Sequence, residues 1–191
     1  MSQKSLDKQY LKGQLLVAMP AMMDPRFIRA VIYVCSHNEH GAMGLVINRL
    51  FGSVSFADLI NQVGIKVPEQ LTDHKVHFGG PMEAGRGFVL HTADYVKEGT
   101  MVVEGDIALT GTLDILQDIA AGHGPKKHML LLGYVGWTPG QLEEEMQENS
   151  WISAPATPEL VFDVEVAIKW EKALQRMGID LPSLSADSGH A

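Results

Sequence analysis

Cysteine is nearly absent from the sequence, and the single Cys35 leaves no partner for an internal disulfide. Long apolar runs are absent too. The run from Leu15 to Ala18 is too short for the core of a signal peptide, and no stretch approaches the roughly 20 apolar residues of a membrane span. These absences favour a cytoplasmic protein with no membrane partner, because reducing compartments keep thiols free.

Basic residues are the next shortage. The 15 Lys and Arg residues stand against 23 Asp and Glu residues, for a formal net charge of −8 at pH 7. They are scattered, and Lys126 and Lys127 form the only adjacent pair. Surfaces that bind nucleic acid draw their affinity from clustered Lys and Arg. We therefore expect no direct nucleic-acid partner.

Motifs for catalysis and cofactor binding are also missing. No Walker A loop, dinucleotide-binding glycine pattern or nucleophile elbow is present. Cys35 lies close to His37, but neighbours in an extended chain point apart and do not build a thiolate–imidazole contact. His37 with His40, and His74 with His77, lack further ligands at a metal-binding spacing. We expect no catalytic residues, no metal and no cofactor.

What the chain does have is material for one core. It is 191 residues long with 46% hydrophobic residues, which suits a single domain. The polar residues 1–10 predict a flexible arm, and residues 183–191 predict a disordered tail. The domain is expected over residues 11–182.

Apolar runs bounded by turn residues predict strands. The expected strands cover residues 15–18, 30–35, 43–48, 76–78, 88–91, 101–104, 107–109 and 129–132. The second and third are joined by a Gly-containing turn, which indicates an antiparallel hairpin. The Gly-rich stretch between 78 and 88 is expected to be a loop.

Helical spacing of apolar residues predicts helices over 55–64, 112–121, from 138 onward, and over 164–177. Ser55 is the expected N-cap of the first. In the third, Thr138 is the expected N-cap, Pro139 the first helical residue, and Gln141 the partner that completes a capping box. Trp170 lies on the apolar stripe of the last helix and is expected in the core.

Four short phrases carry a resemblance to a known family: Gly41–Asn48, Gly79–Pro81, Leu90–His91 and Gly133–Glu145. In this order, over about residues 12–181, the chain resembles the YqgE/AlgH family of bacterial proteins. The resemblance implies a single α+β domain, in which helices surround a bifurcated, partly barrel-like mixed sheet. It implies no activity, because the family has no agreed biochemical function. Some members carry a label linking them to transcriptional control of alginate synthesis.

Two polar residues close apolar strands, and two interpretations of them are open. Asn48 and His91 either form part of a site, since strand ends are where sites gather, or bond a nearby loop. Gly79, Gly80 and Pro81, followed by Arg86, form either an anion cradle made of backbone N–H groups or a plain turn.

Trp137 to Gln141 is the remaining candidate surface. Trp137 precedes a helix start that offers free N–H groups, but a hydrophobic staple with Gln141 as cap explains the same residues. We expect Asn48, His91 and Trp137 to converge at a groove that holds an unknown small ligand or protein. The alternatives are a transcriptional regulator that contacts DNA, and an enzyme that uses His91 with an acidic partner.

Overall fold

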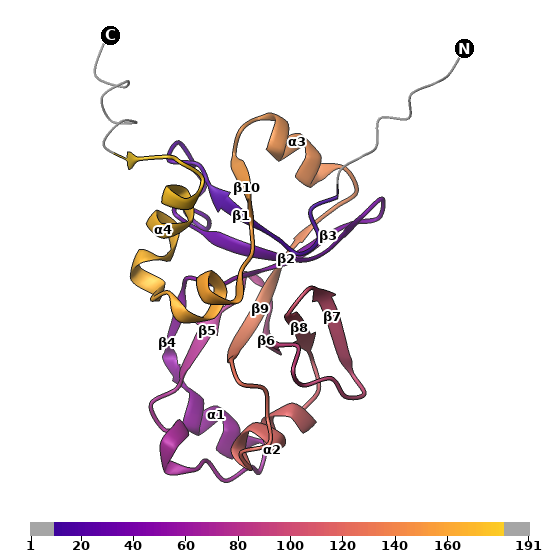
Figure 1. Ribbon diagram of the computed structural model, residues 1–191, viewed down its shortest axis with the longest axis vertical. Coiled ribbons are helices and arrows are strands. Elements are labelled where there is room, and N and C mark those ends of the chain that lie inside the picture. Colours follow the sequence, from indigo (N-terminus) through magenta and orange to yellow (C-terminus); the bar gives the residue numbers. More distant parts are fainter. Residues whose placement is uncertain (1–9, 182–191) are drawn as a thin grey trace.

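The structure is a computed structural model that describes residues 10–181 (Figure 1). Its strands are β1 (Gln14–Ala18), β2 (Val31–Asn38), β3 (Gly41–Val46), β4 (Leu50–Ser55), β5 (Lys75–Phe78), β6 (Met82–Thr92), β7 (Thr100–Glu104), β8 (Ile107–Thr110), β9 (His128–Trp137) and β10 (Trp151–Pro155). Its α-helices are α1 (Phe56–Gln62), α2 (Asp114–Ala120), α3 (Gln141–Gln147) and α4 (Lys169–Arg176). Short helical segments cover η1 (Glu69–Leu71), η2 (Glu159–Asp163) and η3 (Val166–Ile168). The expected tail, and the expected arm apart from Tyr10, lie outside the described residues.

The sheet splits at β9. Along one side β9 pairs with β6, from Met82 opposite Tyr134 to His91 opposite His128. On its other side, the first half of β9 pairs in parallel with β5, and the second half pairs antiparallel with β3. The main strand order is β10-β1-β2-β3-β9-β6-β8-β7, with β4 attached to β5. The sheet is therefore mixed and bifurcated, as the resemblance implied.

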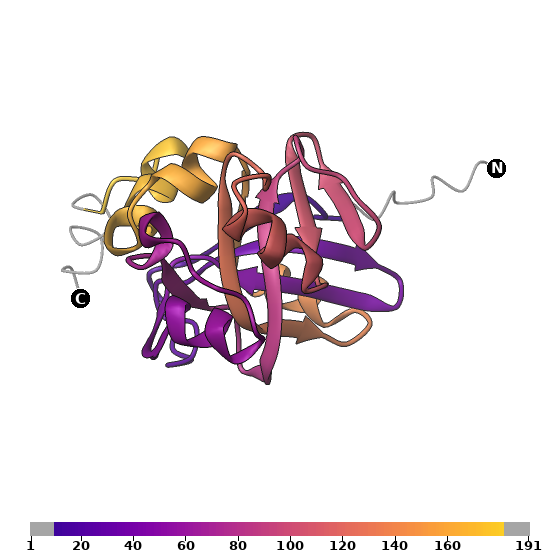
Figure 2. The same cartoon turned by 90° about the horizontal axis from the view of Figure 1, so that it is seen from below.

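The sheet also curls, so that its two far ends approach each other (Figure 2). Gly13, just before β1, lies against Glu104 at the end of β7. A Cβ built on Gly13 would lie 2.4 Å from the Cβ of Glu104, and the φ of Gly13 is +82°. Only glycine combines that backbone angle with so close an approach. The expected α+β fold with a partly barrel-like core is confirmed.

Three apolar clusters hold the helices on the sheet. One fills the inside of the curl beneath α4, one lies between β1–β3 and α3, and one packs α1 and α2 against β5, β6 and β9. The third cluster lies at the opposite end of the molecule from α3 (Figure 1). Trp170 belongs to the first cluster and is 5% exposed, so its expected place in the core is confirmed.

Local sequence signals located several elements correctly. β2 and β3 form the expected antiparallel hairpin. Ser55 caps α1 as expected, since its hydroxyl accepts a hydrogen bond from the Asp58 N–H. Gln141 also reaches back as in a capping box, with its side-chain oxygen 3.0 Å from the Thr138 nitrogen.

Other boundaries were wrong. α3 begins at Gln141, not Pro139, because Gly140 adopts φ +80° and ends a turn before the helix. α4 begins at Lys169, not Val164, because Val164 is extended (φ −79°, ψ 131°) and separates η2 from the later helical residues. β4 and β10 were not expected at all. The loop expected between residues 78 and 88 is short, since β6 begins at Met82.

Candidate functional site

His91 is fully buried, with 0% of its surface exposed. Its Nδ1 lies 2.9 Å from the Thr92 carbonyl oxygen, and its Nε2 lies 2.8 Å from the Thr110 hydroxyl oxygen. Burial lowers the pKa of the imidazole, which favours the neutral ring. Neither hydrogen-bond partner is a carboxylate, and the charge of Asp94 opposes the lowering of the His91 pKa.

The expected convergence of Asn48, His91 and Trp137 is wrong. His91 lies opposite His128, at the first residue of β9, whereas Trp137 is the last residue of the same strand. At about 3.3 Å per residue, that strand separates His91 from Trp137 by roughly 30 Å. Trp137 is 6% exposed and packs near Trp151, with ring centroids 6.5 Å apart. Gln141 closes the turn that follows.

Gly79 and Gly80 lie where the backbone after β5 passes very close to the backbone of β9. A Cβ on Gly79 would lie 2.4 Å from the Gly133 oxygen, and one on Gly80 would lie 2.2 Å from the Tyr134 carbonyl carbon. Glycine is therefore required for the chain after β5 to pass β9. Pro81 follows on the surface. Arg86 belongs to β6, where its exposed guanidinium lies 3.5 Å from Glu83, so no anion-cradling loop surrounds it.

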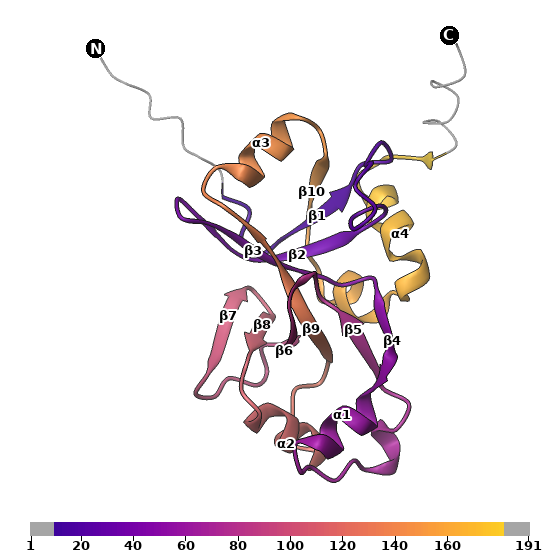
Figure 3. The ribbon, with the colours of Figure 1, turned by 180° about the vertical axis from the view of Figure 1, so that it is seen from behind.

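Asn48 does border a pocket, which we call the Asn48 pocket. Its cavity volume is about 210 Å³. It is lined by Ile28 and Arg29 before β2, Asn48 and Arg49 before β4, and Val166, Ala167, Trp170 and Glu171 of η3 and α4. Figure 3 shows β4 and α4 on the same side of the molecule. Segments that are far apart in the sequence thus meet at this pocket.

The Asn48 carboxamide braces the loop before β2. Its Oδ1 accepts a hydrogen bond from the Val31 N–H at 2.8 Å, and its Nδ2 donates to the Arg29 carbonyl at 2.8 Å. Arg49 donates to the carbonyls of Ile28 and Arg26 in the same loop. These bonds satisfy backbone groups that would otherwise need water.

Arg29 is the residue that this bracing positions. Its φ is +57°, a left-handed angle that is uncommon for a residue with a side chain. Its guanidinium carbon lies 5.3 Å from the centroid of the Trp170 ring, in cation–π geometry. Sequence reasoning missed Arg29, because neither its backbone angle nor its contact with Trp170 leaves a local pattern. The only nearby signal was the polar pair Asn48-Arg49 after an apolar strand.

The side chains that line the Asn48 pocket carry more positive than negative charge. Two guanidinium groups, of Arg29 and Arg49, line it against the single carboxylate of Glu171. The buried Lys169 is not part of the lining, and its Nζ donates to the carbonyls of Ile47 at 3.1 Å and Val161 at 2.7 Å. Burial lowers the pKa of Lys169 to about 8. The pocket is thus locally cationic in a chain of net charge −8.

Other chemistry is sparse in the part of the chain that the structure describes. No group of three or more His, Cys, Asp or Glu side chains there is placed to hold a metal ion. No helix within residues 10–181 is long and apolar enough to cross a membrane. Cys35 is buried, and burial raises the pKa of its thiol to about 12, so the reactive thiolate is not formed near neutral pH.

Alanine in place of Asn48 or His91 is expected to destabilise the fold by about 1–3 kcal/mol, because the first change leaves the part-buried Val31 N–H unpaired and the second removes a buried partner of Thr110. In a chain of this size that lowers the melting temperature by about 2–4 °C per kcal/mol. Calorimetry of Asn48→Ala and His91→Ala measures the loss, with Asn61→Ala, an exposed asparagine of α1, as a comparison. Unchanged melting of both variants would contradict the bracing role.

The fold and pocket together define a class of protein: a small α+β domain with a split, curled sheet and a cationic surface pocket. The chain belongs to the AlgH-like family, whose model matches residues 15–182. A UPF0301 protein of Nitrobacter hamburgensis is 51% identical over 193 residues, covering 97% of this chain and 89% of that protein. A UPF0301 protein of Rhodospirillum rubrum is 51% identical over 182 residues, covering 95% of each.

Solved structures show the same fold. The solution structure of the AlgH protein from Pseudomonas aeruginosa matches with a TM-score of 0.79 and 41% identity, covering 100% of both chains. A crystal structure of a protein from Corynebacterium diphtheriae matches with a TM-score of 0.71 at 23% identity, covering 92% of this chain and 90% of that one. The second likeness concerns the fold alone.

Proposed function

We propose that this protein is a non-enzymatic binding domain, which acts in the cytoplasm and takes a ligand or protein partner at the Asn48 pocket. The observation that carries the proposal is Arg29, held at a left-handed φ of +57° with its guanidinium over Trp170. Left-handed backbone at a residue other than glycine costs about 1–3 kcal/mol, and such strain clusters at ligand-binding sites.

The bracing of Arg29 supports a binding role over a purely structural one. The side chains of Asn48 and Arg49 form hydrogen bonds with the backbone of the loop from Arg26 to Val31. Their effect is to fix the place of one exposed cation on an aromatic ring. A group fixed before binding loses little conformational entropy when a partner arrives, which raises affinity.

The other residues of the expected groove lie away from the Asn48 pocket and have structural roles. His91 is inaccessible, Gly79 and Gly80 permit a backbone crossing, and Trp137 is packed. The proposal therefore keeps Asn48 from the expected groove and adds Arg29, Arg49 and Trp170.

A fragment screen by nuclear magnetic resonance tests this function. Binding fragments should shift the amide signals of Arg29 and Asn48 and the indole N–H signal of Trp170. Arg29→Gly should abolish these shifts while leaving the melting temperature nearly unchanged, since glycine relieves the left-handed backbone as the ring contact is lost. The matched control is Arg86→Gln, an exposed arginine on β6. Fragments that gather elsewhere, or bind Arg29→Gly equally well, would refute the proposal.

A second candidate function is transcriptional regulation by direct DNA contact, which only the AlgH name suggests. With a net charge of −8, we expect affinity for random duplex DNA at physiological salt to be weaker than about 10⁻⁴ M. Fluorescence anisotropy with a labelled duplex at several salt concentrations measures it. Micromolar affinity that falls steeply with salt would overturn this expectation.

A further inference from the structure

We infer that the occupant of the Asn48 pocket is an acidic side chain of a partner protein, presented on a segment whose apolar neighbours rest on the pocket rim. This inference rests on the proposed function and names the class of partner. Its support comes from the size of the pocket, the charge inside it and the apolar residues around it.

The volume of the Asn48 pocket favours a single side chain over a whole small molecule as its occupant. The cavity volume is about 210 Å³. Sites for small molecules usually span about 300–1,000 Å³ and enclose most of the ligand. The Asn48 pocket is below that range, but it can admit one carboxylate side chain while the rest of the partner lies outside.

The charges in the pocket lining favour an acidic side chain of the partner. Among the described residues, Arg29 forms no ion pair, and its side chain is exposed. A guanidinium can bind a carboxylate through two parallel hydrogen bonds, which is stronger than a neutral contact. Arg49 adds a second positive charge to the lining, and Glu171 is the only acid there. A carboxylate is therefore favoured over a neutral or cationic group.

Exposed apolar residues lie in the pocket lining or next to it in the sequence, and we call them the rim. Ile28 lines the pocket and is 45% exposed. Leu50 directly follows Arg49 and is 46% exposed, and Ile168 directly follows Ala167 and is 40% exposed. They come from three separate segments, so the rim is assembled by the fold. Arginine and tryptophan with an apolar surround are the residues that dominate protein–protein interfaces.

A peptide display selection tests the inference without assuming a sequence. A random nonapeptide library is selected on the wild-type protein and depleted on Arg29→Gln. The enriched peptides should share an Asp or Glu flanked by Leu, Ile, Met or Phe. Enrichment of peptides without an acid, or no enrichment at all, would overturn the inference.

Fluorescence anisotropy with synthetic copies of the most enriched peptide then measures how much each residue contributes to the affinity. Arg29→Gln, or replacing the peptide's acid by its amide, should weaken binding about 10- to 100-fold. Ile168→Ser should weaken it severalfold, whereas Met101→Ser, an exposed apolar residue on β7, should not. Glu171→Gln should tighten binding, because it removes the one repelling charge. Equal binding of the acid and amide peptides would contradict the inference.

Three further outcomes distinguish this inference from the proposed function. If phosphate or citrate binds in an Arg29-dependent way and more tightly than every peptide, the site takes a small anion, and only the inference fails. If the wild type is a dimer by light scattering and Arg29→Gln is a monomer, a second copy is the occupant, and again only the inference fails. If neither fragments nor peptides bind at the pocket, both fail.

Discussion

Replacing Trp170 with alanine is expected to cost about 3–5 kcal/mol of folding free energy, as large-to-small changes of core aromatics do. Trp170 is 5% exposed in the cluster that fills the curl of the sheet. Its indole N–H donates to the Ala18 carbonyl at 2.8 Å, so the change also leaves a buried acceptor in β1 unpaired. The variant therefore loses packing and a hydrogen bond together.

Urea unfolding followed by circular dichroism measures the effect as a lower midpoint with an unchanged slope. Trp170→Phe is the matched variant, because it keeps most of the ring volume and loses mainly the hydrogen bond, for about 1–3 kcal/mol. If the urea midpoint of Trp170→Ala equals that of the wild type, the prediction that Trp170 anchors α4 in the core is wrong. The expected loss of about 3–5 kcal/mol is at least a fifth of the roughly 5–15 kcal/mol that stabilises an ordinary domain, so partial unfolding at 37 °C is expected too.

Sequence predicted those parts of the fold that local physics determines. The β-branched run in β2 and the cap at Ser55 both settle their elements within a few residues. β4 and β10 carry no such signal. β4 contains Gly52 and Ser53 in an exposed strand, and β10 is a strand because it pairs with β1 along its whole length. Pairing partners distant in the chain decide elements of this kind.

The candidate site shows the same division. Asn48 was predictable, because a polar residue at the end of an apolar strand is a local pattern. Arg29 was not, because its strained backbone is imposed by Asn48 and Arg49, and Trp170 reaches it from the other end of the chain. His91 has the same sequence pattern as Asn48 but points inward, where Thr110 of β8 accepts or donates its hydrogen bond. Sequence alone does not tell which side of a strand end faces water.

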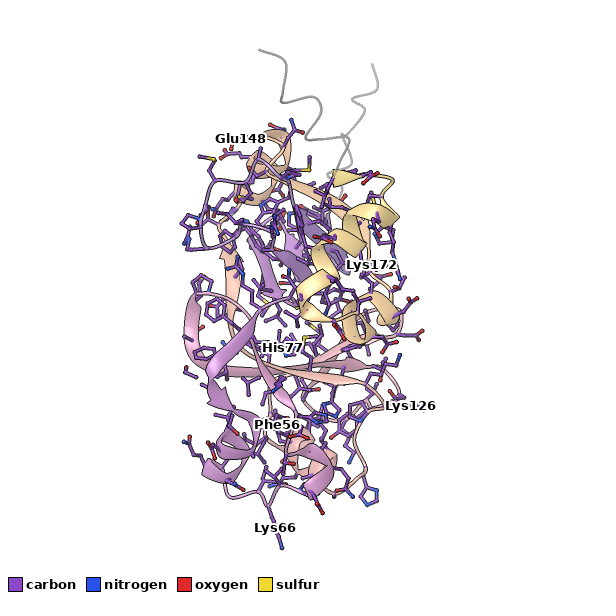
Figure 4. The ribbon with its side chains drawn as sticks, turned by 90° about the vertical axis from the view of Figure 1, so that its left-hand side faces the viewer. Phe56, Lys66, His77, Lys126, Glu148 and Lys172 are labelled. Carbon is purple, nitrogen blue, oxygen red and sulfur yellow. The ribbon has the colours of Figure 1, made fainter. Side chains whose placement is uncertain are left out.

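Lowering the pH from about 6.5 to 4 is expected to destabilise the protein through two half-buried histidines, His77 and His128. Burial, followed by the positive charge of Lys169, lowers the pKa of His77 to about 4. Burial, followed by the charges of His74 and His91, lowers the pKa of His128 to about 4. His77 lies between α4 and Phe56 in the middle of the molecule (Figure 4).

The direction follows from proton binding. Below pH 6.5 the unfolded chain protonates these histidines, whereas the folded chain keeps them neutral until the pH nears 4. The unfolded state then binds more protons, so stability falls as the pH falls, by at most about 1.4 kcal/mol per pH unit for each histidine. Asp24, Asp94 and Asp118 have lowered pKa values and lose their contribution only below this window. Glu145, whose pKa is raised by burial, acts weakly in the opposite direction.

Urea unfolding at half-unit steps between pH 7 and 4 measures the slope. His77 and His128 together should contribute up to about 3 kcal/mol per pH unit in the steepest part, and His77→Gln and His128→Gln should each remove up to about 1.4 kcal/mol per pH unit. The fully buried His91, whose pKa burial also lowers, adds to the wild-type slope in the same direction. Both variants start from a lower stability at pH 7, so the slope is the quantity to compare. His40→Gln is the control, since its side chain is 84% exposed, and it should keep the wild-type slope. A wild-type stability that stays level down to pH 4.5 would mean that the interior admits the protonated rings, and that water or a shift of α4 solvates them.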